Sequence, residues 1–189
     1  KLIRENRATA QQGDIFAPAV QTLFKTLIQQ EFFRLVGEAL PASGQLLVDA
    51  FAGVGTFAVI FADRFEKVIA IEESHSAARD ALANAETIPN VEVRAGKVEE
   101  VLPLLQRAPD AVLLDPPRPG CAPPVLEAIA RFRPGVVVSV SCNPATLARD
   151  LRVLSGSGYL VDSVTPLDMF PQTGHIECVA RLSLAPVRG

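Results

Sequence analysis

The sequence lacks a long hydrophobic run and has few cysteines and histidines. Apolar runs such as residues 135–140 are far shorter than the roughly 18 to 20 residues that cross a bilayer. The chain does not open on a basic and apolar secretory signal. Three cysteines and two histidines, without a CxxC spacing, predict neither a disulfide framework nor a metal site. We therefore expect a cytoplasmic protein with reduced thiols, no bound metal and no membrane partner.

The sequence also lacks an excess of basic residues. It has 18 Lys and Arg against 21 Asp and Glu, which gives a formal net charge of −3. Because non-specific affinity for nucleic acids comes mainly from clustered Lys and Arg, we expect this chain alone to bind a polyanion weakly. The first residue is Lys1 rather than Met, so we expect the chain to be part of a longer protein. Another domain would then hold most of a nucleic-acid substrate.

The sequence does contain enough hydrophobic residues for one core. Its 189 residues are 49% hydrophobic, which is typical of a single globular domain. Residues 1–15 are polar and mixed, and apolar residues then recur near the helical period from Pro18 to Leu40. We therefore expect residues 1–40 to form a lead-in segment with an amphipathic helix, and residues 41–189 to form the folded domain.

Short apolar segments alternate with helical stretches in residues 41–189. Such alternation predicts βαβ units and a parallel sheet. Two further strands, 159–165 and 176–184, follow each other without a helix, which predicts a hairpin-like antiparallel end. The expected fold is α/β, with a doubly wound, mostly parallel, seven-stranded Rossmann-like sheet and a C-terminal antiparallel strand, as in class I methyltransferases. The other predicted strands are residues 46–50, 68–71, 91–94, 111–114 and 136–140.

A glycine turn follows the first predicted strand. The segment Gly53-Val-Gly55 opens a helix, and such a turn lets a ligand approach the backbone closely in NAD enzymes and methyltransferases alike. Asp49 would repel a pyrophosphate but suits the ammonium of a methionine moiety; the alternative is a solvated or helix-capping acid. Glu72 ends the second strand, where a carboxylate can bind both ribose hydroxyls, or it is a surface acid. Asp49 therefore favours a methyltransferase, and an NAD-dependent oxidoreductase is the remoter alternative.

The fourth and fifth predicted strands each end in a motif that contains proline. The segment Asp115-Pro-Pro-Arg118 leaves the sheet at its carboxyl edge, where ligands bind in α/β proteins. It is similar to a loop of amino methyltransferases, but Arg118 replaces their aromatic residue, so we do not expect an exocyclic amine as the target. Arg118 could contact a phosphate or the substrate base, or cap the loop. The segment Ser141-Cys-Asn-Pro144 places a thiol at the same edge, next to a helix that begins at Pro144.

Three segments, in one order, carry a resemblance to a known family. Asp115–Gly120, Ser141–Asp150 and Asp168–Glu177 together resemble the RNA uracil-5-methyltransferases that modify transfer and ribosomal RNA. The resemblance covers residues 45–184. It implies that residues 41–189 are a catalytic domain that methylates uracil C5 in RNA, with S-adenosyl-L-methionine as cofactor and tRNA or rRNA as partner. Family members commonly carry an N-terminal β-barrel that binds RNA, and nothing in this chain corresponds to it. We therefore expect a missing N-terminal RNA-binding domain.

The resemblance also implies roles for single residues. Cys142 is the expected nucleophile, because uracil C5 is too weakly nucleophilic to be methylated until a thiolate adds to C6. Glu177 is the expected base that removes the C5 proton so that the thiolate can leave. His175 either orients Glu177 or packs within its loop, whereas Cys121 and Cys178 match no catalytic position. Together with the glycine turn, the expected cofactor-binding residues are Asp49, Phe51, Gly53, Thr56, Glu72 and Asp115.

One segment departs from the family. A Phe-x-Gln-x-Asn segment whose glutamine contacts the cofactor corresponds here to Phe16-Ala-Pro-Ala-Val20, which has neither polar residue; Gln21 is a possible substitute. A non-catalytic S-adenosylmethionine-binding or RNA-binding module is therefore the main alternative to an enzyme. The presence of both Cys142 and Glu177 favours retained chemistry. DNA cytosine-5 enzymes also use a thiol, but their cysteine normally follows a proline, and here it follows Ser141.

Overall fold

The structure is a computed structural model that describes residues 18–169 and 176–186, with side chains from residue 26 onward. The chain divides into two units, Lys1–Arg34 and Leu35–Gly189. Helix α2 (Pro18–Ala39) crosses the boundary between them, and the sheet with its other helices belongs to the second unit. The expected division of the chain at residue 40 stays a prediction.

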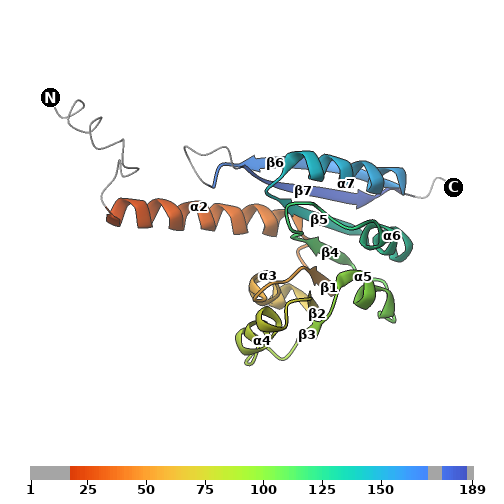
Figure 1. The fold of residues 1–189 in the computed structure, drawn as a ribbon, viewed down its shortest axis with the longest axis horizontal. Coiled ribbons are helices and arrows are strands. Elements are labelled where there is room, and N and C mark those ends of the chain that lie inside the picture. Colours follow the sequence, from red (N-terminus) through yellow and green to blue (C-terminus); the bar gives the residue numbers. More distant parts are fainter. Residues whose placement is uncertain (1–17, 170–175, 187–189) are drawn as a thin grey trace. The chain divides into compact units, whose positions relative to one another are not determined.

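The second unit is built around one sheet, which has seven strands within the described residues (Figure 1). Their order is β3-β2-β1-β4-β5-β7-β6. Strands β1 to β5 are parallel to their neighbours among these five, whereas β7 is antiparallel to both β5 and β6. The predicted α/β fold, with a mostly parallel sheet and an antiparallel C-terminal strand, is therefore confirmed. The strands are β1 (Gly44–Ala50), β2 (Phe65–Glu72), β3 (Val91–Ala95), β4 (Ala111–Leu114), β5 (Val136–Ser141), β6 (Tyr159–Leu167) and β7 (Glu177–Leu184).

Helices connect the parallel strands, as βαβ units require. Figure 1 shows α3 and α4 on one side of β1, β2 and β3, with α5 on the other side. Proline begins both α6 and α7, at the helix position where a missing N–H removes no hydrogen bond. The helices are α3 (Thr56–Ile60), α4 (His75–Asn84), α5 (Val98–Val101), α6 (Pro123–Phe132) and α7 (Pro144–Gly156), with short 3₁₀ turns at η2 (Ala62–Arg64) and η3 (Leu102–Leu104).

The middle strands are apolar along nearly their whole length because both of their faces are covered. Every residue of β4 and β5 is buried. On one face of the sheet, Val48 and Ile71 belong to the same hydrophobic cluster as Val125 and Ile129 of α6. On the opposite face, Asp49 reaches the backbone of α3. Continuous apolar runs, rather than alternating ones, are typical of parallel strands that are covered on both sides.

The strand order brings the predicted site residues to one edge. The order changes direction between β1 and β4, and open α/β sheets bind ligands in the crevice at such a point, outside the carboxyl ends of the strands. Phe51, Asp115 and Cys142 directly follow β1, β4 and β5, and Glu72 is the last residue of β2. The fold therefore places these four residues at the carboxyl edge.

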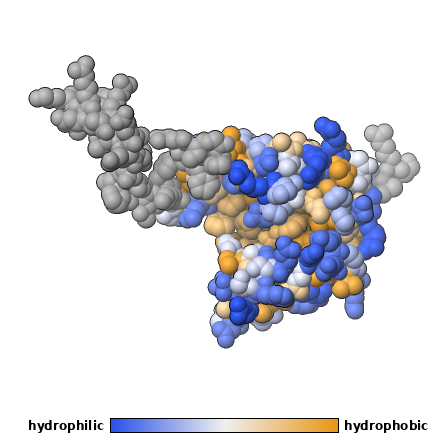
Figure 2. All heavy atoms as spheres, viewed as in Figure 1, coloured by the Kyte–Doolittle hydropathy of each residue, from blue (hydrophilic) through white to orange (hydrophobic). Residues whose placement is uncertain are grey.

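The surface of the viewed face is mixed in polarity. Figure 2 shows hydrophobic residues gathered in the middle of this face, with hydrophilic residues above and below them. Strand β6 forms one edge of the sheet and exposes Leu160, Val161 and Val164. Of the helices in the described part of the chain, none combines the length and the hydropathy needed to span a membrane.

Candidate active site

The turn after β1 has an unusual backbone. Phe51, Gly53 and Gly55 all have positive φ angles, of 65°, 56° and 80°. A residue other than glycine in this region costs on the order of 1–3 kcal/mol, and such strain is found mostly where a ligand or a switch requires it. A Cβ on Gly53 would meet nothing within 4 Å, whereas a Cβ on Gly55 would lie 3.2 Å from Cβ of Ala81 in α4. Gly55 therefore serves helix packing, and Gly53 leaves open space beside the backbone.

Asp49 is completely buried beneath this turn. Its Oδ2 accepts a hydrogen bond of 2.9 Å from the N–H of Ala58 in the first turn of α3. Its Oδ1 has no hydrogen-bond partner among the described residues. The pKa of Asp49 is raised to about 7, mainly by burial; the Ala58 hydrogen bond opposes this rise, and the nearby carboxylates of Asp115 and Glu72 contribute to it. Asp49 therefore caps α3 with one oxygen, and its other oxygen can accept a hydrogen bond from a ligand.

Glu72 joins the turns that follow β1 and β2. Its Oε2 accepts a hydrogen bond of 2.8 Å from the N–H of Gly53, and its Oε1 accepts one of 2.7 Å from the N–H of Ser74. A carboxylate oxygen can accept two hydrogen bonds, so each oxygen retains a second acceptor site. The carboxylate is thus held in one orientation and can still accept two hydroxyl groups, as the sequence predicts for a ribose.

Asp115 directly follows β4, which lies on the opposite side of β1 from β2, the strand that ends at Glu72. Its N–H donates to the carbonyl of Ala50 over 3.3 Å, which keeps the exit of β4 beside the exit of β1. Its side chain is solvent exposed, yet the surrounding protein displaces enough water to raise its pKa to about 6, and the carboxylate of Glu177 adds to this. Asp115 is therefore close enough to Glu177 for the two carboxyl groups to interact electrostatically.

Cys142 and Glu177 come from neighbouring antiparallel strands. The last pair of the ladder between β5 and β7 is Ser141 with Cys178, so Cys142 directly follows this pair and Glu177 directly precedes it along the chain. Paired residues in an antiparallel ladder have Cα atoms about 4.5–5.5 Å apart, so adjacent strands are close at this end. Both residues are half-buried, and desolvation raises the pKa of Glu177. The register thus brings the predicted nucleophile and the predicted base to the same end of two neighbouring strands.

The three cysteines differ in exposure. All are free thiols; Cys121 and Cys178 are buried, whereas Cys142 is partly accessible. Burial raises the pKa of Cys121 to about 12, with a further contribution from Asp150, so it stays a thiol at neutral pH. Burial and the neighbouring Glu177 also raise the pKa of Cys178. Of the three, Cys142 is the most accessible to a ligand.

Carboxyl groups gather at the carboxyl edge of the sheet. Asp49 is the last residue but one of β1, Glu72 ends β2, Asp115 directly follows β4, and Glu177 begins β7. The charges of Asp115 and Glu72 contribute to the raised pKa of Asp49, and the charge of Glu177 contributes to the raised pKa of Asp115. A ligand with positive charge would relieve this repulsion. The edge is therefore suited to a cationic ligand, which agrees with the sequence-based choice of a methyltransferase over an NAD enzyme.

For the remaining predicted residues within the described part of the chain, the structure gives a position in the fold but no hydrogen bond to the carboxyl groups of the site. Thr56 is the first residue of α3 and is exposed next to the glycine turn. Phe51 is half-buried and packs against the hydrophobic cluster beneath the sheet. His175 and Phe16 lie outside the described residues, and the side chain of Gln21 is not described either.

Four polar residues that hydrogen-bond to the loop after β4 were not predicted from the sequence. Asn143, Thr146, Arg149 and Asp150 all contact the loop at residues 118–121, which belongs to the motif at the end of β4. Positions 143, 146 and 150 are separated by three and four residues, so they share one face of a helix. This spacing was the available signal that α7 carries a polar contact surface.

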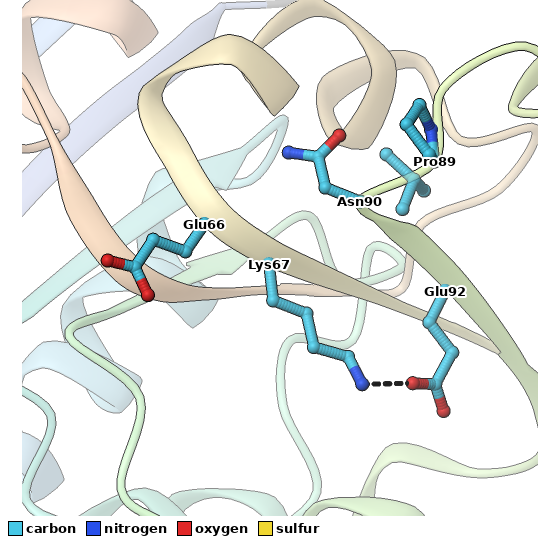
Figure 3. A pocket seen from close by; sticks show the side chains of 6 residues that line it. Glu66, Lys67, Pro89, Asn90 and Glu92 are labelled. Carbon is cyan, nitrogen blue, oxygen red and sulfur yellow. Dashed lines mark ion pairs between the residues drawn. The ribbon is translucent and has the colours of Figure 1, made fainter.

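A pocket of about 370 Å³ lies elsewhere, near the amino ends of β2 and β3 (Figure 3). Glu66, Lys67, Pro89, Asn90 and Glu92 are among its lining residues, and Lys67 Nζ pairs with Glu92 Oε2 at 2.5 Å. It includes none of the predicted site residues. Because parallel sheets bind ligands at the carboxyl ends of their strands, we assign the chemistry to the opposite edge.

The fold and the carboxyl-edge site define a class I methyltransferase architecture. The same fold occurs in the precorrin-6y C5,15-methyltransferase of Geobacter metallireducens, with a TM-score of 0.69 over 82% of this chain and 88% of that chain, at 17% identity. The model of the tRNA (uracil-5-)-methyltransferase family matches residues 19–184. The chain therefore belongs to this family, as the three motifs predict.

Relatives of known structure or sequence support the same assignment. An uncharacterized RNA methyltransferase of Synechocystis is 49% identical over 149 residues, covering 77% of this chain and 32% of that protein. Another, from Oceanobacillus iheyensis, is 44% identical and covers 74% of this chain and 31% of that protein. The tRNA (uracil-54, C5)-methyltransferase of Pyrococcus abyssi, solved with S-adenosyl-L-homocysteine, has a TM-score of 0.71 at 36% identity, covering 80% of this chain and 37% of that chain. The chain thus spans about a third of the length of these proteins.

Proposed function

We propose that this chain catalyses S-adenosylmethionine-dependent methylation of uracil C5 in tRNA or rRNA through a covalent cysteine adduct. One observation supports the proposal: Cys142 and Glu177 adjoin the last pair of the β5–β7 ladder, Ser141–Cys178, at the carboxyl edge of β5. A thiol next to a carboxylate of raised pKa is the pair that this chemistry needs. Family membership and the similarity to the tRNA (uracil-54, C5)-methyltransferase of Pyrococcus abyssi support the same reaction.

The residues of the crevice fit S-adenosyl-L-methionine. When bound, this cofactor supplies a methyl group on a positively charged sulfonium. The unpartnered Oδ1 of Asp49 suits its ammonium, and the two acceptor sites left on Glu72 suit its ribose hydroxyls. The open space beside Gly53 allows close approach to the backbone. We propose that these residues hold the cofactor together with Phe51, Thr56 and Asp115.

Cys142 and Glu177 would divide the chemistry between them. The thiolate of Cys142 forms a bond to C6 of uracil, and the electron pair of the C5–C6 double bond moves onto O4 to give an enolate. The enolate makes C5 nucleophilic enough to accept the methyl group: the new C5–methyl bond would form as the methyl–sulfur bond breaks, with its electron pair returning to sulfur to leave a neutral thioether. Glu177 then takes the proton from C5, the double bond re-forms, and the C6–S bond breaks to release the thiolate. The target base has to leave its stack for C6 to meet Cys142.

Glu177 is tuned for this task by its surroundings. Partial burial raises its pKa, which makes its carboxylate a stronger base than an exposed glutamate. The proton that it accepts has to be released again before the next cycle. Its half-exposed position allows exchange with water.

RNA binding would rest largely on parts outside this chain. The net charge of −3 offers little attraction for a phosphate backbone. The curated relatives are about three times as long as the segment they share with this chain. We propose that an additional RNA-binding domain completes the enzyme, and that it works in the cytoplasm, where thiols such as Cys142 stay reduced.

The test is methylation of an RNA transcript by the full-length protein, followed by nucleoside mass spectrometry. We expect 5-methyluridine with the wild type and none with Cys142→Ala. The control is Ser155→Ala, at an exposed position near the end of α7 that is remote from the carboxyl edge, which should retain the activity. Formation of 5-methyluridine by Cys142→Ala, or of a different methylated nucleoside by the wild type, would contradict the proposal.

A further inference from the structure

The loop at residues 118–121 is tied to the beginning of α7 by two side chains. Asn143 Nδ2 and Thr146 Oγ1 both donate to the carbonyl oxygen of Arg118, at 3.3 and 3.2 Å. Asn143 also caps α7, because its Oδ1 accepts from the N–H of Ala145 at 3.1 Å. The residue that directly follows Cys142 therefore fixes both the helix start and the loop.

One turn further along α7, Arg149 and Asp150 bind the other end of the loop. Arg149 Nη2 donates to the carbonyl oxygens of Pro119 and Cys121, at 2.9 and 3.1 Å. Asp150 Oδ2 accepts from the N–H of Cys121 at 2.8 Å, and its Oδ1 accepts from Arg149 Nε and Nη2 at 2.9 and 2.7 Å. Asp150 is only 5% exposed. A buried carboxylate with both oxygens bonded in this way is a fixed anchor rather than a surface acid.

Gly120 shows how closely the loop approaches α7. It has a φ of 80°, and a Cβ on it would lie 2.6 Å from both Arg149 Nη2 and Asp150 Oδ2. Only glycine accommodates both the backbone conformation and this separation. The segment Asp115–Gly120 and the helix at 144–150 therefore fit together as one unit.

This unit connects the two halves of the crevice. The loop begins just after Asp115, at the end of β4, and α7 begins just after Cys142, at the end of β5. Each of these residues lies one position beyond its strand. The Leu114–Ser139 pair is the last one between β4 and β5, although Asp115 N–H still bonds to Ala50 and the β5–β7 ladder continues to Ser141. Beyond that pair, the contacts between α7 and the loop join the segment after Asp115 directly to the segment after Cys142.

We propose that Arg149 and Asp150 are positioning residues, which hold the loop at 118–121 against α7 and thereby fix Cys142 relative to Asp115. This inference rests on the proposed function, because it assigns these residues to the geometry of the same reaction. Neither side chain contacts the reacting atoms in this scheme. Misplacement of a reacting group by about 1 Å can lower a rate by 10²-fold, so the effect of losing them should be kinetic.

The test measures how fast a covalent adduct forms with an RNA that contains 5-fluorouridine, which has no C5 proton for Glu177 to remove. In the full-length protein, we expect Asp150→Asn and Arg149→Ala to slow adduct formation by about 10- to 100-fold at saturating cofactor. Cofactor affinity, measured by calorimetry, should change much less. The matched control is Arg152→Ala, at an exposed position of the same helix, which should form the adduct at the wild-type rate.

A purely structural role of the two residues would give a different result. The melting temperature of both variants would fall, while the rate of adduct formation per folded molecule would equal that of the wild type. That outcome would overturn the inference. A second readout is the rate at which iodoacetamide alkylates Cys142, which should be faster in Asp150→Asn than in the wild type. Buried Cys178 should stay unlabelled in both proteins. Equal labelling of Cys142 and Cys178 would indicate general unfolding. If the wild type forms no adduct, the proposed function fails, and the alkylation rates still decide the positioning role.

Discussion

Asp49 is a carboxylic acid inside the protein, with one oxygen bonded and the other without a partner among the described residues. The sequence left open whether Asp49 binds an ammonium or is a solvated or helix-capping acid, and the structure shows the capping contact with the N–H of Ala58 in α3. Which N–H it bonds could not be predicted, because the Ala58 N–H comes within reach only after the glycine turn has formed. Its raised pKa is likewise a property of the fold, since it depends on burial. The predicted cofactor role of Asp49 stays a prediction, and the structure adds a measurable property.

Asp49 should make the stability of the ligand-free protein depend on pH. The pKa of Asp49 is raised from 3.8 to about 7 in the folded protein, so its contribution to the free energy of unfolding is fully present below pH 4 and is lost as the pH rises through 7. At about 1.4 kcal/mol per pKa unit, the free energy of unfolding of the wild type should fall by roughly 3 kcal/mol more than that of Asp49→Asn between pH 5 and pH 8. Urea unfolding at the two pH values measures this, with exposed Asp80→Asn as the control. Equal losses in wild type and Asp49→Asn would contradict the assignment.

Glu177 allows a second prediction at the level of one residue. If it removes the C5 proton, Glu177→Gln should add the thiol and transfer the methyl group but fail to release the product. We expect a methylated RNA–protein adduct to accumulate with ordinary uridine, visible as a slow band on a denaturing gel. Exposed Glu127→Gln in α6 should turn over normally without such a band. Normal turnover by Glu177→Gln would show that another group takes the proton.

At the scale of elements, the strands were more predictable than the contacts between loops. Each apolar segment named from the sequence became a strand, because these segments are short, apolar and separated by helical stretches; the run Val136–Val140, for example, holds four valines and directly follows Gly135. The positive φ of Phe51 was not predictable, since nothing in an aromatic residue signals a left-handed turn. The contacts of Arg149 and Asp150 with the loop were missed for another reason. They join residues about thirty positions apart, which local periodicity does not report.

The two glycines of the turn after β1 should differ in what their replacement affects. A non-glycine residue in this conformation costs on the order of 1–2 kcal/mol at either position. Gly55→Ala should cost more stability, because its Cβ would also press on Ala81, whereas Gly53→Ala should mainly lower cofactor affinity by filling open space. Thermal unfolding and calorimetric titration with S-adenosyl-L-methionine separate the two effects. Equal stability losses with unchanged cofactor affinity would argue against a cofactor role for Gly53.

At the scale of the whole molecule, the charge of the chain favours the proposed cofactor over a phosphate backbone. The crevice gathers carboxylates, which suits a cationic cofactor and opposes a phosphate backbone. The net charge of −3 is in keeping with this. The family model covers residues 19–184, and this match extends over only about a third of the curated relatives. The chain therefore represents the part of the family that carries the Cys142–Glu177 pair, and affinity for RNA is expected from elsewhere.

This division predicts a weak salt dependence of RNA binding. A protein that makes 6–10 phosphate contacts loses about 10³–10⁵ in affinity between 50 and 200 mM salt. We expect the 189-residue chain alone to lose less than about tenfold, and a full-length relative such as the Synechocystis protein to approach the larger loss. Fluorescence anisotropy with a labelled RNA stem-loop measures both. A steep salt dependence of the chain alone would show that it carries its own RNA-binding surface.

The covalent step is the central claim, and intact-mass analysis with 5-fluorouridine RNA tests it most directly. The full-length protein, incubated with S-adenosyl-L-methionine and this RNA, should gain the mass of the RNA plus one methyl group, and peptide mapping should place the bond on Cys142. Attachment to another residue, or a methylated 5-fluorouridine product without any covalent species, would contradict the account.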